Sequence, residues 1–296
     1  MHIVLAGATG FLGSALARRL SNDGHHLSTL TRTPRASGDI HWDPYGPPSR
    51  WADALQHADA VINLAGASIA KRWTAAHKEE MWNSRIRTTK ALVEAMKRQS
   101  TPPATLLNAS AVGIYGARGD EPLTEDSAPG SGFLASLCQA WEQEARAAAP
   151  QTRVVLLRSG IALDAGGGAL PQMALPFRLF VGGRLGSGRQ YFSWIHRHDW
   201  VAMVAWALGT GTITGPLNVT APHPVTNAEF SGTLARVLRR PALLPVPAMA
   251  LRIAAGEMAA ELLTGQRVLG AKAQAGGFAF QYPDLESALS EIYGRA

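Results

Sequence analysis

Short apolar runs alternate with longer stretches of helical periodicity through the first half of the chain. The apolar runs at residues 1–6, 26–30, 40–42, 59–66, 105–110 and 153–158 predict strands. Helical patterns occupy residues 14–20, 75–98 and 132–149, and the last of these ends at Pro150. Alternating strands and helices are typical of a parallel sheet with helices on both faces. We therefore predict an α/β fold built on a doubly wound parallel sheet.

The second half of the chain has a less regular pattern. A strand is predicted at 215–219, a turn at 222–226 and a helix at 227–238. From residue 245 onward the pattern is mostly helical, with an amphipathic helix at 249–263 and a last helix at 286–292. Glycine clusters at 165–168 and 182–188 indicate loops that either cover a substrate or are ordinary flexible turns. We expect this half to form a smaller, mostly C-terminal lobe.

The segment between the first predicted strand and the first predicted helix reads Gly-Ala-Thr-Gly-Phe-Leu-Gly, at 7–13. Gly7 permits a tight turn, Gly10 lets the backbone approach a pyrophosphate, and Gly13 lets the helix pack close to the strand. The free amides and positive dipole end of that helix would face the phosphates. An ordinary strand-to-helix turn is the alternative interpretation. The residues expected to hold a dinucleotide are Gly7, Thr9, Gly10, Phe11, Leu12 and Gly13.

The end of the second predicted strand indicates which dinucleotide this would be. An NAD site usually has an Asp or Glu there, which accepts hydrogen bonds from the ribose hydroxyls. This chain instead reads Thr31-Arg32, and no acid follows until Asp39. A guanidinium can pair with a 2′-phosphate, and the Thr31 hydroxyl can add a hydrogen bond. We therefore expect NADP rather than NAD, unless Arg32 is merely a solvated loop residue.

The overall composition fits one or two globular domains. The chain has 296 residues, of which 46% are hydrophobic and 17% charged. Its most apolar helical stretch is interrupted by Arg252, Glu257 and Glu261, so no membrane span is predicted. A single cysteine, Cys138, excludes an internal disulfide and a cysteine-cluster metal site. The N-terminus lacks a signal-peptide pattern, and we expect a cytoplasmic protein.

The net charge of +6 and the isoelectric point near 9.8 raise the question of nucleic-acid binding. However, the basic residues are scattered, and they form neither a continuous run nor an alternation with aromatic residues. A mildly basic surface that attracts anionic metabolites is the simpler account. We therefore expect a small-molecule substrate, and neither nucleic acid nor a membrane as a partner. A homodimer is left open.

Four motifs resemble, in chain order, those of extended short-chain dehydrogenases/reductases, the group that includes nucleotide-sugar epimerases. They are the glycine turn at 7–13, Asn-Leu-Ala-Gly at 63–66, Ser-Ala-Val-Gly-Ile-Tyr-Gly at 110–116, and the segment at 193–199. Residues 268–283 are similar to an extra module of one atypical branch, usually labelled an epimerase family protein or cell-division-inhibitor-like, whose reaction is unassigned. The resemblance covers nearly the whole chain. It implies a Rossmann-type, NAD(P)-binding domain at 1–220, with substrate-side loops from about 165, and a short helical module at 245–292 packed on the substrate side.

The same resemblance implies further cofactor contacts. Matching Thr89 to the group's threonine places Arg85 where an Asn commonly reaches the dinucleotide, and an Arg there could pair with phosphate. Glu80, five residues earlier on the same predicted helix, would face either the cofactor or Arg85. Alternatively, both are surface charges. In the resembling proteins the backbone after the fourth strand passes beside the cofactor, at positions matched here by Leu64, Ala65 and Gly66.

One feature of the group is missing from this chain. The standard enzymes carry Tyr-x-x-x-Lys on a helix, where the Tyr exchanges a proton with the substrate oxygen and the Lys lowers the Tyr pKa. Matching Glu142 to the acid that usually follows places Leu134 and Cys138 at these two positions. Shifting the match does not help, because no Lys occurs between Lys97 and Lys272. A carbonyl reduction or an epimerisation would need another proton donor.

Several other side chains are candidates for contacts near the reacting atoms. The group's usual serine position falls on Ala111, and Ser110, one residue earlier, is expected to contact the cofactor. The titratable candidates for a proton donor are Tyr115, His196 and His198, each with a packing or structural role as the alternative. The catalytic residues stay unassigned, and no metal site is expected. The side chains expected on the substrate side are Tyr115, Arg189, Trp194 and His196.

Two functions of different classes follow from these observations. The first is an NADP-dependent oxidoreductase or epimerase with a non-standard proton donor, whose substrate would enter at the carboxyl edge of the sheet. The second is a catalytically silent module that holds NADP as a sensor or structural ligand and contacts another protein. The glycine turn fits both, and the missing Tyr and Lys favour the second.

Overall fold

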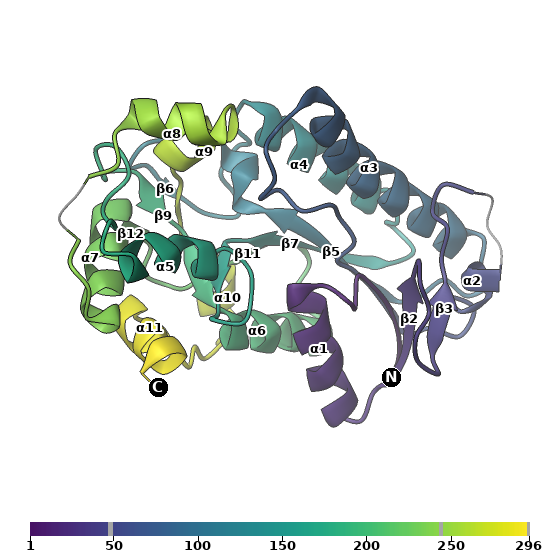
Figure 1. Ribbon diagram of the computed structural model, residues 1–296. Helices are drawn as coiled ribbons and strands as arrows, with labels where there is room; N and C mark the ends of the chain where they lie inside the picture. The colour runs from purple at the N-terminus through teal and green to yellow at the C-terminus, as the bar shows by residue number, and fades with distance from the viewer. Residues whose placement is uncertain (47–49, 243–244, 295–296) are drawn as a thin grey trace.

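Seven parallel strands form the central sheet, in the order β11-β7-β5-β4-β1-β2-β3 (Figure 1). The structure is a computed structural model and describes residues 1–46, 50–242 and 245–294. The strand bounds are β1 (His2–Ala6), β2 (His26–Thr31), β3 (Asp39–His41), β4 (Ala60–Asn63), β5 (Thr105–Ala111), β7 (Arg153–Ser159) and β11 (Gly215–Val219).

Helices cover both faces of this sheet, which explains why its inner strands β1, β4 and β7 are mostly apolar. Successive side chains of a strand point to opposite faces. Ile3 and Leu5 accordingly pack in one core cluster with residues of α1 (Phe11–Asn22) and α6 (Arg197–Gly209). Val4 and Ala6 pack in another, with residues of α2 (Arg50–Asp53), α3 (Ala75–Lys97) and α4 (Phe133–Arg146). The predicted doubly wound, Rossmann-type sheet is confirmed.

The strand order creates a switch point between β1 and β4. From β1 the chain proceeds outward to β2 and β3, then returns across the sheet to add β4, β5, β7 and β11 on the other side. Ligands of open α/β sheets bind in the crevice beyond the carboxyl ends of the strands at such a point. Here those ends lead into the glycine turn after β1 and the loop after β4, which are therefore neighbours.

The remaining elements form a smaller lobe beyond the carboxyl ends of β5, β7 and β11 (Figure 1). It contains three short strand pairs, β8 with β10, β9 with β12, and β6 with β13. Its strands are β6 (Pro122–Leu123), β8 (Ile161–Leu163), β9 (Tyr191–Phe192), β10 (Trp194–His196), β12 (Val225–Thr226) and β13 (Arg267–Val268). Its helices are α5 (Leu170–Arg178), α7 (Asn227–Leu238), α8 (Ala248–Ala255), α9 (Met258–Leu263), α10 (Ala271–Ala275) and α11 (Leu285–Tyr293), and a 3₁₀ turn at Val112–Tyr115 follows β5.

Polar contacts attach the C-terminal elements to the sheet domain. The buried carboxylate of Asp199 accepts hydrogen bonds from the backbone amides of Gln281 and Tyr282, at 3.0 and 2.8 Å. The buried Glu125 carboxylate accepts from the amide of Asn218 in β11 at 3.0 Å, and from that of Lys272 at the start of α10 at 3.3 Å. The last quarter of the chain is thus built into the same body as the sheet.

Two local predictions need correction. The amphipathic helix predicted at 249–263 is two helices, α8 and α9, because Gly256 takes a φ of +61° that interrupts the helical path. The turn predicted at 222–226 ends in the short strand β12, which pairs antiparallel with β9. The helix that follows, α7, begins where it was predicted, with Thr226 and Glu229 forming a capping box.

Candidate functional site

The glycine turn between β1 and α1 has the close backbone approaches that a dinucleotide turn requires. A Cβ on Gly13 would lie 2.1 Å from the Gly7 carbonyl oxygen, and a Cβ on Gly7 would lie 2.8 Å from the backbone of Leu64. Gly7 also takes a φ of +87°. Gly10 is the N-cap of α1 and supplies no side chain to its first amides. Those amides therefore stay available to a phosphate.

The other residues predicted for the turn lie at its surface. Thr9 and Gly10 are exposed, and Phe11 and Leu12 are half-buried. The turn thus presents backbone and small groups at the crevice above β1, and the residues present fit a dinucleotide. Thr9 has no role in the hydrogen bonds of the described residues, so its hydroxyl can turn toward a ligand.

In the loop after β2 the cation Arg32 is exposed, whereas the first acid, Asp39, is hydrogen-bonded to the loop itself. Arg32 is exposed directly after the strand, next to the half-buried Thr31. The carboxylate of Asp39 accepts hydrogen bonds from the Thr29 hydroxyl and from the amides of Arg35 and Ala36, the latter two at 2.7 and 3.0 Å. The Thr29 hydrogen bond, followed by the Arg35 amide, lowers the pKa of the Asp39 carboxyl. The Asp39 carboxylate thus stabilises this loop through hydrogen bonds from its own residues.

The loop after β4 lies against Arg85 of α3. The Arg85 guanidinium donates to the carbonyl oxygens of Ala67, at 2.9 Å, and Met81, at 3.1 Å, and lies 5.2 Å from the Trp141 ring centre. A Cβ on Gly66 would come within 3.2 Å of that guanidinium carbon. Burial lowers the pKa of Arg85. Arg85 therefore supports the loop of Leu64, Ala65 and Gly66, instead of lying at the surface.

Glu80 does not join Arg85 among the contacts of the described residues. Its exposed carboxylate lies 2.9 Å from Nδ1 of His77, one turn earlier on α3. The Nε2 atom of His77 lies 2.8 Å from the carbonyl oxygen of Ser68. Glu80 and His77 thus connect the start of α3 to the loop that follows Gly66.

Helix α4 presents apolar side chains at the two positions matched to the lost Tyr and Lys. Leu134 packs on Gly113, since a Cβ there would lie 3.2 Å from that of Leu134. Cys138 is buried in a cluster with Val112 and Tyr115. Burial, and then the charge of Glu142, raise the pKa of the Cys138 thiol to about 12. Neither side chain can exchange protons near neutral pH.

Ser110 and Tyr115 belong to a buried polar network centred on Arg158 in β7. The Ser110 hydroxyl donates to Glu142 at 2.8 Å, and the Glu142 carboxylate is paired with the Arg158 guanidinium. The Tyr115 hydroxyl donates to Asn218 at 2.7 Å and accepts from Arg158 at 2.8 Å. Burial raises the pKa of Tyr115. Both hydroxyls are committed inside the protein, which the sequence motifs around them did not reveal.

The other substrate-side candidates differ in exposure. Trp194 is completely buried in an apolar cluster, and its indole donates to the His223 carbonyl oxygen at 3.1 Å. His196 is buried as well; its Nδ1 accepts from the amide of His198 and its Nε2 lies 3.1 Å from Glu291. Burial lowers the pKa of His196. Arg189 and His198 remain exposed. The structure thus gives Trp194 and His196 packing and capping contacts where we expected side chains facing a substrate.

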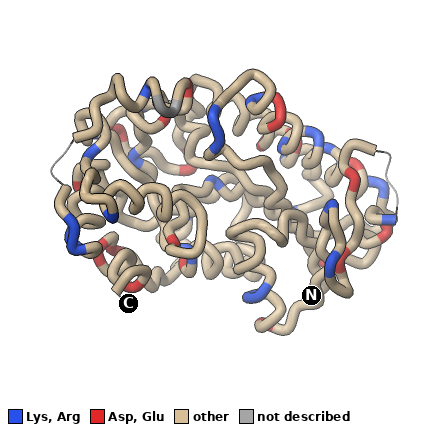
Figure 2. The backbone as a smooth tube through the Cα atoms, in the orientation of Figure 1, with Lys and Arg blue, Asp and Glu red and all other residues tan. Residues whose placement is uncertain are grey.

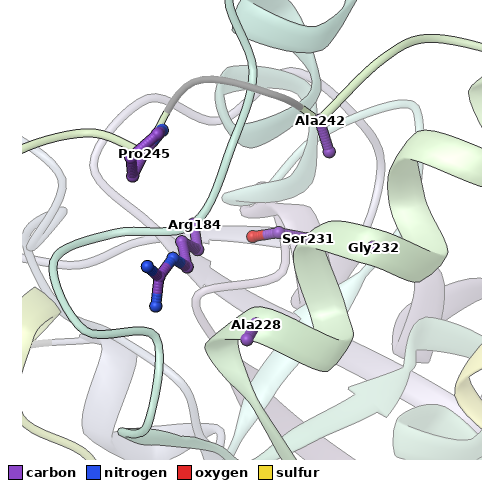
Figure 3. A pocket seen from close by; sticks show the side chains of 6 residues that line it. All are labelled: Arg184, Ala228, Ser231, Gly232, Ala242 and Pro245. Atoms are coloured by element: carbon purple, nitrogen blue, oxygen red, sulfur yellow. The ribbon is translucent and has the colours of Figure 1, made fainter.

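A shallow cavity of about 250 Å³ lies outside this crevice, between the Gly182–Gly188 loop and α7 (Figure 3). None of its lining residues belongs to the predicted site. Those residues are Arg184, Ala228, Ser231, Gly232, Ala242 and Pro245.

Lys and Arg are spread over many elements and interleaved with Asp and Glu (Figure 2). Within the described ranges, no cluster of His, Cys, Asp and Glu could hold a metal ion.

This fold and this turn define an α/β protein of the dinucleotide-binding class. The model of the NAD dependent epimerase/dehydratase family matches residues 3–219, and a domain of unknown function, DUF1731, matches residues 246–292. The chain belongs to the NAD dependent epimerase/dehydratase family. It is thus an NAD(P)-binding protein of the epimerase family, as its motifs indicated.

Similar proteins come from bacteria, plants and animals. The epimerase family protein YfhF of Bacillus subtilis is 42% identical over 99% of this chain and 98% of its own length. A chloroplastic homologue of the epimerase family protein SDR39U1 in Arabidopsis thaliana is 40% identical, over 99% of this chain and 86% of its own. The crystal structure of human SDR39U1 with NADPH has a TM-score of 0.91 and 36% identity, and each chain covers 100% of the other.

Proposed function

We propose that this protein binds NADP and acts as an oxidoreductase or epimerase-like enzyme on a small molecule. The arrangement at the end of β2 carries the choice of cofactor. Arg32 is exposed there, whereas Asp39 is already occupied by Thr29 and two loop amides. A 2′-phosphate would thus meet a cation instead of a free carboxylate. The related human protein was crystallised with NADPH, which supports the same choice.

The proton donor in this proposal is non-standard. Bound NADP would supply or accept a hydride, and this chain's residues would have to bind, orient and protonate the substrate. Leu134 and Cys138 cannot protonate the substrate near neutral pH. Of the three titratable candidates, His198 is exposed, whereas Tyr115 and His196 are buried, so we favour His198 as the donor. The substrate stays unassigned.

A direct test compares binding with turnover. Titration with NADPH and NADH measures the two dissociation constants, and we expect NADPH to bind at least about tenfold more tightly, because a charged hydrogen bond to its phosphate adds 1.5–3 kcal/mol or so. Equal affinities would contradict the assignment of Arg32. NADPH oxidation on a panel of carbonyl compounds and nucleotide sugars then tests whether any hydride moves.

The second candidate is a catalytically silent NADP-binding sensor or interaction module. The buried network of Ser110, Tyr115 and Arg158 favours it, since these hydroxyls are already hydrogen-bonded inside the protein. Tight NADPH binding without turnover on any panel member would support this candidate over the enzyme.

The proposal also includes a location and partners. We place the protein in the cytoplasm, with a small-molecule ligand, without nucleic-acid or membrane partners, and with a homodimer left open. In the part of the chain that the structure describes, no helix combines the length and apolar character needed to cross a bilayer. Fractionation of cells that express the tagged protein tests the compartment.

A further inference from the structure

The first residue of α1 and the first residue of α6 lie side by side. Phe11 begins α1 at the glycine turn, and Arg197 begins α6 after β10. The Arg197 guanidinium carbon lies 5.1 Å from the centre of the Phe11 ring, in cation–π geometry. Figure 1 shows the two helices next to each other below the sheet. A cation from the second half of the chain therefore reaches the start of α1, where the glycine turn leads into the helix.

An acid from a neighbouring loop holds this cation in place. A Nη nitrogen of Arg197 lies 3.0 Å from the Asp164 carboxylate, and both side chains are partly exposed, at 26% and 21%. The other Asp164 oxygen accepts from the amide of Gly166 at 2.6 Å. The remaining guanidinium nitrogens of Arg197 have no hydrogen-bond partner among the described residues. They can therefore donate to a ligand that arrives from solvent.

The glycines after Asp164 allow their loop to lie directly on Phe11. A Cβ on Gly167 would be 2.7 Å from the Phe11 ring, and one on Gly168 would be 2.8 Å from it. Gly168 also has a φ of +70°. The turn at 165–168 thus packs on the Phe11 ring. It fixes the Phe11 ring from one side, with Arg197 also stacked against that ring.

We propose that Arg197 binds a phosphate oxygen of the dinucleotide, completing from the second half of the chain the anion site that begins with the α1 amides. This inference rests on the proposed NADP binding. A dinucleotide pyrophosphate carries two negative charges, and α1 contributes amides and a dipole but no charged side chain in its first turn. A partly exposed guanidinium with free donors beside Phe11 supplies the missing cation.

Two substitutions distinguish phosphate binding by Arg197 from a purely structural role of its ion pair with Asp164. Arg197→Gln removes the cation, and we expect the dissociation constant for NADPH to rise about tenfold or more. Asp164→Asn keeps Arg197 and the acceptor for the Gly166 amide but removes a negative charge near the phosphate. NADPH should then bind equally well or more tightly. If the Asp164–Arg197 ion pair only holds the two segments together, both variants should bind NADPH more weakly.

Ligand probes locate the affected phosphate. Adenosine 2′-monophosphate carries the phosphate expected at Arg32 but lacks the pyrophosphate, so Arg197→Gln should leave its affinity unchanged. Arg197→Lys should restore part of the NADPH affinity. Arg19→Gln is the matched control, because Arg19 lies at the far end of α1 and pairs with Asp23 at 2.7 Å. Its NADPH affinity should equal that of the wild type.

The outcomes are distinguishable. Wild-type NADPH affinity in Arg197→Gln, or equal weakening of NADPH and adenosine 2′-monophosphate, would overturn the role of Arg197 and leave the proposed cofactor intact. Failure of the wild-type protein to bind NADPH would overturn both. The melting temperature of each unliganded variant shows whether a loss of affinity reflects a loss of fold.

Discussion

The Glu142 carboxylate holds the Arg158 guanidinium through two hydrogen bonds, 2.8 and 3.0 Å long, with both side chains almost completely buried. Glu142 comes from α4 and Arg158 from β7, so the pair fixes the helix that carries Leu134 and Cys138 against the sheet. Ser110 and Tyr115 bond to the same two side chains. The hydroxyls near the end of β5 are therefore part of the protein's internal support.

Glu142→Gln should destabilise the protein strongly, because it leaves the Arg158 charge buried without a counter-charge. We expect a loss of about 3–5 kcal/mol in the free energy of unfolding, measured by urea denaturation. Glu144→Gln, two residues further along α4, is the matched control and should stay within about 0.5 kcal/mol of wild type. Replacing both partners with apolar residues should recover part of the loss. A small effect of Glu142→Gln alone would show that the pair contributes little.

The Cys138 thiol should be unreactive in the native protein. Its pKa of about 12 leaves almost no thiolate at pH 8, and the side chain is buried. A chromogenic disulfide reagent at pH 8 should label it far more slowly in the folded protein than after denaturation, where labelling is complete. Raising the pH should speed native labelling, since the folded pKa lies above the usual thiol value. Rapid, complete labelling of the folded protein at pH 8 would contradict this environment.

Arg32→Ala should remove the preference for NADPH over NADH. The affinity for NADPH should fall about 10- to 100-fold, the usual range for a lost charge-assisted hydrogen bond, and that for NADH should change little. Arg35→Ala provides a control in the same loop, because the Arg35 backbone amide, and not its side chain, binds Asp39. Calorimetric titration of the three proteins measures the ratio. An unchanged ratio in Arg32→Ala would place the 2′-phosphate elsewhere.

Gly13→Ala should abolish dinucleotide binding and destabilise the fold. Its Cβ would lie 2.1 Å from the Gly7 carbonyl oxygen, so α1 must move away from the turn. Gly209→Ala is a suitable comparison, because a Cβ at the end of α6 meets nothing within 4 Å. That change should be neutral or stabilising by up to about 1 kcal/mol. Thermal unfolding with and without NADPH measures both effects, and a tolerant Gly13→Ala variant would argue against the close approach.

The sequence predicted the sheet and the glycine turn because both depend on local patterns. Apolar runs bounded by turns identified the strands, and the spacing of Gly7, Gly10 and Gly13 identified the turn. The sequence could not predict the burial of Trp194 and His196. A motif indicates which residues lie near the end of a strand, but not whether their side chains face a ligand or the protein interior. Burial of those side chains depends on α11 and on other parts of the last eighty residues.

The anion contact proposed for Arg197 had no local signal either. Asp164, Arg197 and Phe11 are far apart in the chain, and only the approach of α6 to α1 brings them together. The same holds for Glu125, which joins β11 to α10. The glycine cluster at 165–168 is visible in the sequence. The need for glycine there comes from the Phe11 ring packed against it, which only the folded protein shows.

The order of strands also matters while the chain is being synthesised. β7 ends at Ser159, but its outer neighbour β11 begins at Gly215, so the ribosome must add all the intervening residues before that edge can be paired. During this interval a newly made sheet presents an open row of peptide groups to other nascent chains. The edge of β7 is therefore open to such pairing from the completion of Ser159 until Gly215–Val219 has been made.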